Sequence, residues 1–219
     1  MNMKKTIITI FILINIRSSY SQVVINEIMY APSDATNEWF EIYNIGNSAA
    51  DIQNWKWKDA TSSIRNITGQ SIILYPDSFI VICQDSIKLK SQFPSLSGKF
   101  IQTVWSALNN SGDNVIIIEA DNSRADSVSF LPVWGGNTGG YSLEKINSTG
   151  ASNISGNWGT CIDMKKATPD EQNSITPKLY DLYLKKFEYT PLFPSKGENL
   201  SFDFLIKNSG LSDAGNFLL

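Results

Sequence analysis

The sequence predicts an all-β protein whose main unit is a β-sandwich. From residue 23 onward, short apolar or alternating runs recur about every ten residues, separated by Asn, Gly, Ser, Asp and Pro, as is typical of sandwiches and barrels. No segment shows a sustained helical period. The predicted strands cover residues 23–30, 38–44, 55–58, 71–74, 79–83, 99–104, 114–119, 125–130 and 141–145.

Turn signals lie between these strands. Residues 75–78 (YPDS) and 110–113 (NSGD) combine polar side chains with Pro, which presets φ, or Gly, which allows positive φ. Residues 121–123 (DNS) are predicted to form the tip of a hairpin between two strands. The turns therefore support the division into short strands.

The start of the chain has the features of a signal peptide. Lys4 and Lys5 precede an apolar stretch at 6–16, and a polar stretch at 17–21 carries small residues before a cleavage point at Gln22. An apolar run of about 11 residues is shorter than the roughly 20 that cross a bilayer. We predict a secreted or cell-surface protein with no membrane insertion after signal cleavage.

Charge and composition exclude several classes of function. The formal net charge of −3 becomes −6 once the three basic residues of the leader are removed, so nucleic acid is not an expected partner. The chain contains no histidine, which removes Ser/His/Asp and Cys/His nucleophiles and the usual zinc sites. We predict no catalytic residue, no cofactor and no enzyme activity, although carboxylate-only glycoside hydrolysis stays open.

The two cysteines, Cys83 and Cys161, allow two interpretations. An oxidising compartment would permit a disulfide between them. Alternatively, Cys83 alternates in phase with Phe79 and Val81 and would be a buried free thiol. The sequence cannot choose, because a disulfide depends on the distance between the two Cα atoms.

Six motifs in order resemble the lamin tail domain family. They are residues 24–30 (VINEIMY) with 38–44 (EWFEIYN), 51–59 (DIQNWKWKD), 78–82 (SFIVI), 108–115 (LNNSGDNV), 126–130 (DSVSF), and 141–145 (YSLEK) with 157–159 (NWG). Asn54 stands where the family usually has Gly, and Asn tolerates the left-handed conformation that a turn needs. The resemblance implies an immunoglobulin-like sandwich that serves as a module beside other domains.

The chain beyond the sandwich divides into two further parts. Residues 167–177 (ATPDEQNSITP) are predicted to be a linker after a lamin-tail-like domain at 22–166. Residues 178–219 alternate twice and resemble the start of a bacterial cell-adhesion-related immunoglobulin-like domain. Since such a sandwich takes about 100 residues, we expect this second domain to be partial.

An acidic cluster is the most suggestive set of side chains. It comprises Glu27, Asp34, Glu38 and Glu41. If the strands at 23–30 and 38–44 pair about a loop near Asp34, Glu27 and Glu41 lie directly opposite each other and need a cation, a proton or a basic neighbour. Calcium is one solution, and a lysine or arginine neighbour is preferred; the pair could also lie out of register. No metal ligand is assigned on this basis.

Tryptophans offer a second candidate surface. A stacking platform for a sugar or peptide is possible, but packing in or beside the core is the favoured interpretation for each one. The six are Trp39, Trp55, Trp57, Trp105, Trp134 and Trp158.

Together these features predict a non-catalytic interaction or scaffolding module of a larger extracellular or cell-surface protein. Its partner would be a protein or a cell-surface polymer. Two alternatives stay open: an accessory domain of an exported hydrolase whose catalytic domain lies beyond residue 219, and a carbohydrate-binding module.

Overall fold

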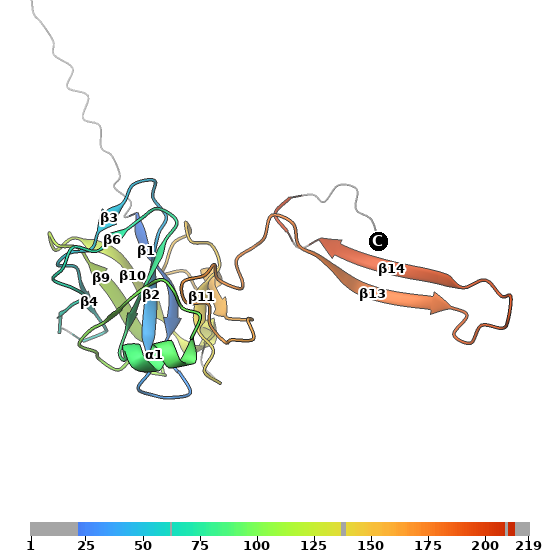
Figure 1. The fold of residues 1–219 in the computed structure, drawn as a ribbon, viewed down its shortest axis with the longest axis horizontal. Coiled ribbons are helices and arrows are strands. Elements are labelled where there is room, and N and C mark those ends of the chain that lie inside the picture. Colours follow the sequence, from blue (N-terminus) through green and yellow to red (C-terminus); the bar gives the residue numbers. More distant parts are fainter. Residues whose placement is uncertain (1–21, 62, 137–138, 209, 213–219) are drawn as a thin grey trace, which may run out of the picture.

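A computed structural model describes residues 22–61, 63–136, 139–208 and 210–212, in which a β-sandwich is followed by a hairpin that extends away from it (Figure 1). The predicted signal peptide lies outside these residues. The strands are β1 (Val23–Met29), β2 (Trp39–Asn44), β3 (Ala50–Asp51), β4 (Lys56–Lys58), β5 (Arg65–Asn66), β6 (Ile73–Leu74), β7 (Phe79–Cys83), β8 (Lys99–Gln102), β9 (Asp113–Ile118), β10 (Arg124–Phe130), β11 (Leu143–Lys145), β12 (Trp158–Thr160), β13 (Leu182–Thr190) and β14 (Ser201–Asn208). The described residues also form one short α-helix, α1 (Ser86–Gln92), and two 3₁₀ turns, Pro132–Trp134 and Ser155–Asn157.

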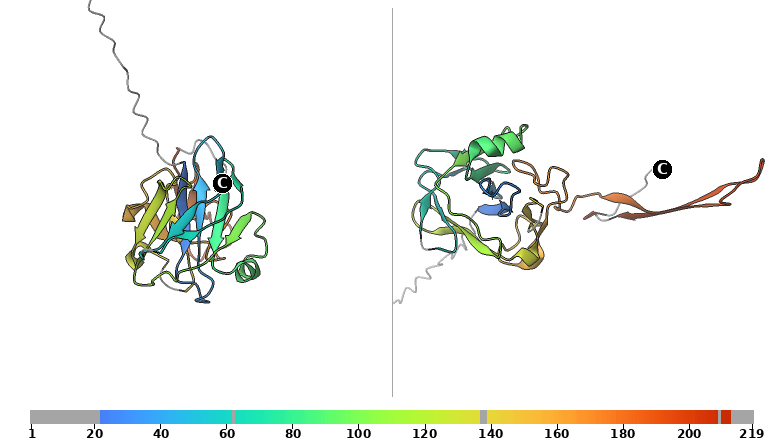
Figure 2. Two further views of the ribbon diagram at one scale, coloured as in Figure 1. Left: turned by 90° about the vertical axis from the view of Figure 1, so that its left-hand side faces the viewer. Right: turned by 90° about the horizontal axis from the view of Figure 1, so that it is seen from below.

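Two facing sheets form the sandwich (Figure 2). The larger has six strands in the order β12-β11-β1-β2-β7-β8, and the smaller has four in the order β10-β9-β4-β5. All neighbours are antiparallel except β7 and β8, which run parallel. The predicted all-β sandwich is confirmed.

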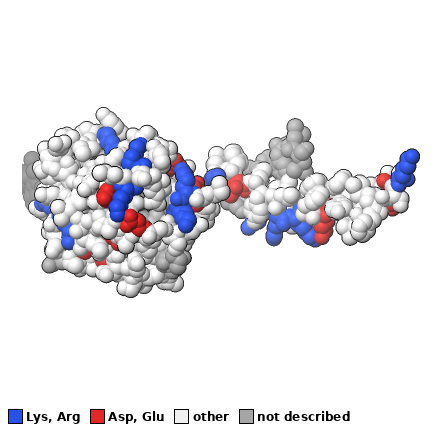
Figure 3. Space-filling model, turned by 60° about the horizontal axis from the view of Figure 1, so that its bottom comes forward, with Lys and Arg blue, Asp and Glu red and all other residues white. Residues whose placement is uncertain are grey.

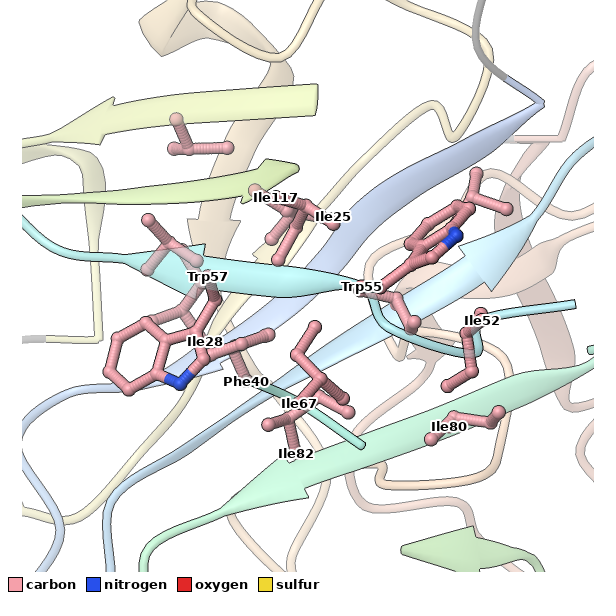
Figure 4. Close-up of a cluster of buried hydrophobic side chains, with 14 of the residues drawn as sticks. Ile25, Ile28, Phe40, Ile52, Trp55, Trp57, Ile67, Ile80, Ile82 and Ile117 are labelled. Carbon is pink, nitrogen blue, oxygen red and sulfur yellow. The ribbon is translucent and has the colours of Figure 1, made fainter. Parts of the chain in front are cut away.

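The main core fills the space between the sheets. Ile25, Ile28 and Phe40 of the larger sheet face Trp57 and Ile117 of the smaller one, as Figure 4 shows, and each is at most 1% exposed. Trp57 also packs on Phe40, with ring centroids 5.3 Å apart. This apolar layer accounts for the alternation that predicted the strands.

Each predicted strand is present, with ends that differ by at most two residues. The short strands β3, β5 and β12 were not predicted. Asn54 adopts φ 60° and Gly112 φ 118°, so both expected turns use the left-handed region. Asn122, at φ 70°, forms the tip of the β9–β10 hairpin.

Helix α1 was also missed by the sequence prediction. It is seven residues long and buries only Leu89, which is too little to produce an amphipathic period. Asp85 caps it by accepting hydrogen bonds from the backbone N–H groups of Ile87 and Lys88. The helix covers Trp39 and other apolar side chains on the outer face of the six-stranded sheet. No helix in the described part of the chain is long and apolar enough to cross a membrane.

Both cysteines are buried free thiols. Cys83 packs in the cluster under α1, and Cys161 lies near the Ser174 hydroxyl, 3.5 Å from its oxygen. Burial is the main cause that raises the pKa of each thiol to about 12. The buried-thiol interpretation is confirmed, and the disulfide interpretation is wrong for this structure.

Candidate functional site

Three glutamates form a row across the outer face of the six-stranded sheet. Glu27 of β1 pairs with Glu41 of β2 on one side and with Glu144 of β11 on the other. All three side chains are fully buried. The predicted opposition of Glu27 and Glu41 is confirmed, whereas Glu144 was not included in the prediction.

A β-bulge sets the direction of Glu27. The β1–β2 register shifts between Ile25 and Glu27, and the extra residue is Asn26. Ile25 therefore faces the core while Glu27 faces outward, although strict alternation would place the two on one face. The Ile25 N–H at the bulge donates to Asp126 Oδ2 at 2.8 Å.

Residues 167–175, which we call the cap, cover the glutamate row. Thr168 holds two of the carboxyl groups at once, because its backbone N–H donates to Glu27 Oε1 at 2.9 Å and its hydroxyl donates to Glu144 Oε1 at 2.7 Å. The same hydroxyl oxygen lies 3.4 Å from Glu27 Oε2. Glu144 Oε2 accepts from the Ser174 hydroxyl and the Ile175 N–H, at 2.7 and 3.2 Å.

The third glutamate, Glu41, is held in a similar way. Its Oε2 accepts from the Asp170 N–H at 2.6 Å, and its Oε1 accepts from the Asn26 side-chain amide at 2.9 Å. Asn173 locks the cap in place by donating to the backbone carbonyls of Asn26 and Lys145, at 2.9 and 2.8 Å. All six carboxyl oxygens of the row therefore have a hydrogen-bond partner.

Burial controls the protonation of the row. Desolvation, together with the neighbouring charge of Glu144, raises the pKa of Glu27 to about 8. Desolvation, followed by the charge of Glu27, also raises the pKa of Glu41 well above its ordinary value. Hydrogen bonds from the cap oppose both shifts without cancelling them. At neutral pH a proton therefore compensates the close approach of Glu27 and Glu41.

Two sequence predictions need correction here. The preferred lysine or arginine neighbour is absent, since the ion pairs among the described residues include none of the three glutamates. The interpretation of 167–177 as a linker is wrong for the cap, because Ala167, Thr168 and Asn173 are at most 4% exposed. The polar composition of this segment resembled that of a linker. Several of its polar groups instead donate hydrogen bonds to the buried carboxyl groups.

Calcium is expected to leave the thermal stability unchanged. The carboxyl oxygens that could bind the ion already accept hydrogen bonds from the cap. In the described residues, no three His, Cys, Asp or Glu side chains are arranged so that they could hold a metal ion. A ligand that bound only the folded state would raise the melting temperature. Melting curves in millimolar calcium and in chelator should coincide, and a rise that Glu41→Gln removes would contradict this expectation.

Comparison with known proteins identifies the family. The family model described as Lamin Tail Domain matches residues 17–131, which is more than half of the chain. The chain belongs to the lamin tail domain family. Among curated proteins none matches this chain. Among solved structures, a DUF4876 family protein from Bacteroides thetaiotaomicron is similar at 12% identity and TM-score 0.42, over 71% of this chain and 72% of that chain; a likeness at this level carries no functional argument.

The cap lies outside the part of this lamin tail domain protein that the family model matches. The matched residues end just after β10, whereas Glu144 and the cap follow later in the chain. Glu27 and Glu41 therefore lie within the matched residues, whereas Glu144 and the cap lie beyond them.

The remaining acidic residues of the predicted cluster lie apart from the row. Asp34 is exposed and pairs with Lys88 at 2.7 Å. Glu38 accepts from the Trp105 indole N–H at 2.7 Å and from the Leu108 N–H at 2.9 Å. Burial is the main cause that raises the pKa of Glu38. These contacts assign Asp34 and Glu38 to local structure rather than to a shared site.

The tryptophans of the lamin tail domain are part of its cores. Trp39 packs under α1, and three others belong to the main core, namely Trp55, Trp57 and Trp158. Trp105 and Trp134 pack against that core while partly buried. The favoured interpretation as core residues is confirmed, so the tryptophans do not form an open platform.

An open pocket of about 320 Å³ adjoins the cap. Tyr43 of β2 and Phe79 of β7 lie opposite each other in the sheet, with ring centroids 4.5 Å apart and an interplanar angle of 19°. Both rings are partly exposed. The other lining residues are Asn26, Asp77, Ser148, Gln172, Asn173 and Thr176. The outer face of the sheet thus has three zones: an apolar one under α1, the sealed glutamate row, and this open aromatic pair.

Proposed function

We propose that this protein is a secreted, non-catalytic interaction module that binds a partner protein through the hairpin β13–β14. The hairpin extends outside the sandwich (Figure 1). The strand register gives it one apolar face. The proposal rests on that face, because exposed apolar surface of this extent is typical of interaction sites.

The register shows how the hairpin becomes amphipathic. Phe187 pairs with Phe204 and Tyr189 pairs with Phe202, and a bulge after Leu184 keeps Leu184 on the same face. The apolar face comprises Leu182, Leu184, Phe187, Tyr189, Phe202, Phe204 and Ile206. The opposite face is mixed and includes Lys186, Glu188 and Asp203. Phe187, Phe202 and Phe204 stack on one another while each is about half exposed.

The apolar face suits a particular kind of partner. A two-stranded sheet with a row of apolar side chains packs well against another apolar sheet, face to face. An isolated two-stranded hairpin is marginally stable in water, so such packing would also stabilise it. We therefore expect the partner to be a protein that presents an apolar β-sheet.

The burial of the acidic groups supports a non-catalytic role. Catalysis by carboxylates alone needs two carboxyl groups that reach substrate. Glu27, Glu41 and Glu144 are fully buried and hydrogen-bonded under the cap. The chain also has no histidine to act as a general base.

Secretion and surface location are part of the proposal. The basic, apolar and polar regions at 1–21 support export. On the face that Figure 3 shows, basic and acidic side chains are interspersed rather than gathered into a basic stripe, which favours a protein or polymer partner over nucleic acid.

A binding assay on intact cells tests the proposed function. The full chain, expressed with its own leader, is expected to lose residues 1–21, to bind cells of the encoding organism saturably, and to hydrolyse no peptide, ester or glycan substrate. Phe187→Ser with Phe204→Ser should weaken cell binding about tenfold by removing the centre of the apolar face. The control, Lys186→Ser with Asp203→Ser, changes the opposite face and should bind as the original protein does. Robust turnover, or equal binding by both double variants, would refute the proposal.

A further inference from the structure

The pocket beside the cap is lined by aromatic rings and by polar side chains that can bind hydroxyl groups. Tyr43 and Phe79 supply ring surface, and the Tyr43 hydroxyl donates to Asp77 Oδ1 at 3.0 Å, which fixes the orientation of its ring. Asp77 and Gln172 are exposed at the rim. Ring faces attract the polarised C–H groups of a sugar, while carboxylate and amide groups accept from and donate to its hydroxyls.

The wall of the pocket is rigid before any ligand binds. Asn173 is 4% exposed and donates to the backbone carbonyls of Asn26 and Lys145. Asn26 is also 4% exposed, and its amide donates to Glu41 and to Asn173 Oδ1, at 2.9 Å in both cases. Ordered side chains lose little conformational entropy on binding, which favours affinity in a small pocket.

The surroundings exclude two other classes of ligand. Among the described residues, none that lines the pocket is Lys or Arg, so phosphate and sulfate groups have no cation to pair with. Strand addition by a peptide needs a free sheet edge. Here β2 lies between β1 and β7, and β7 lies between β2 and β8, so both strands under the pocket are already paired on each side.

We infer that this pocket binds a neutral saccharide, with the stacked Tyr43–Phe79 pair as its aromatic wall and Asp77 and Gln172 as hydroxyl ligands. The volume is at the small end of ligand pockets, which suits a short stretch of sugar rather than a long chain. This site is separate from the hairpin and would give the protein a second attachment, to a surface polymer.

Titration calorimetry of the full chain tests the inference with defined probes. The probes are the hexasaccharides of cellulose, xylan, mannan and laminarin, with heparin as the anionic comparison. At least one neutral probe should bind, and heparin should not. Tyr43→Ala and Phe79→Ala should each weaken that binding about tenfold or more, and Asp77→Ala or Gln172→Ala should weaken it severalfold.

Matched controls keep the outcome clear. Tyr75→Ala removes an aromatic side chain that is 59% exposed in the same turn as Asp77 but lines a different groove, so binding should be unchanged. Asp77 and Gln172 are exposed, so their substitution tests the site even if a ring variant fails to fold. No binding by any neutral probe at millimolar concentration, binding of heparin alone, or equal binding by the pocket variants would overturn the inference. Saturable cell binding that depends on Phe187 and Phe204 would still support the hairpin proposal in that case.

Discussion

Raising the pH from about 5 to about 9 is expected to lower the free energy of unfolding by a few kcal/mol. The cause is burial, which raises the pKa values of Glu27 and Glu41 in the folded protein. One unit of pKa difference between the folded and unfolded states corresponds to about 1.4 kcal/mol. The pKa of about 8 for Glu27 lies well above the value of 4.5 for an ordinary glutamate.

The sign follows from proton linkage. Between pH 4.5 and 8 the unfolded chain has released the Glu27 proton while the folded protein retains it. Because the folded state then binds more protons, its stability falls as the pH rises. The contribution is fully present below about pH 4.5 and is lost once the pH passes through about 8.

Few other groups affect the free energy of unfolding between pH 5 and 9. The chain has no histidine, the side chain that normally titrates there. Asp34 and Asp51 have pKa values lowered by hydrogen bonds, chiefly from Lys88 and Ser71 respectively, so their effect lies at acidic pH. Burial raises the pKa of Glu38, and it therefore acts in the same direction as Glu27.

Denaturant unfolding at several pH values measures this dependence. Glu27→Gln keeps the shape of the side chain without its titration, so it should flatten the curve and make the protein more stable than the original at pH 9. The control is Glu171→Gln, the same change at an exposed position of the cap, which should leave the slope as it was. Stability that rises between pH 5 and 9, or a Glu27→Gln curve parallel to the original, would show that the row is not protonated.

A chain that ends at residue 166 is expected to melt about 10 °C below one that ends at residue 177. The shorter chain lacks the cap and leaves Glu27, Glu41 and Glu144 side by side without the hydrogen-bond donors that the cap supplies. It also loses the buried contacts of Ala167, Thr168 and Asn173. Each such hydrogen bond contributes about 0.5–1.5 kcal/mol, and 1 kcal/mol shifts the melting temperature of such a domain by about 2–4 °C.

A single substitution tests the same contact in the intact protein. Thr168→Val removes the hydroxyl that bridges Glu27 and Glu144 but keeps the branched shape, and we expect it to cost about 1–3 kcal/mol. Thr176→Val is a comparison at the residue that follows the cap, since no hydrogen bond of the Thr176 hydroxyl to the glutamate row is present among the described residues. For the shortened chains, melting temperatures within about 2 °C of each other for the ends at 166 and 177 would mean that residues 167–175 act as a linker.

The sequence by itself determined the strands and one pair of the buried row. Alternation with period two is visible in a single strand, so residues 23–30 and 38–44 could be paired about Asp34 without a structure. That pairing placed Glu27 opposite Glu41, as observed. The lack of histidine likewise excluded whole classes of catalytic site from composition alone.

Only the tertiary structure decided how the charges are compensated. Glu144 reaches Glu27 because β11 pairs with β1, a contact between residues more than a hundred positions apart in the chain. The donors of the cap come from still further along, and their hydrogen bonds depend on how a polar segment folds back onto the sheet. Local patterns carry no signal for such long-range contacts. A segment rich in Thr, Asp and Asn therefore resembled a linker, although it covers three fully buried carboxyl groups.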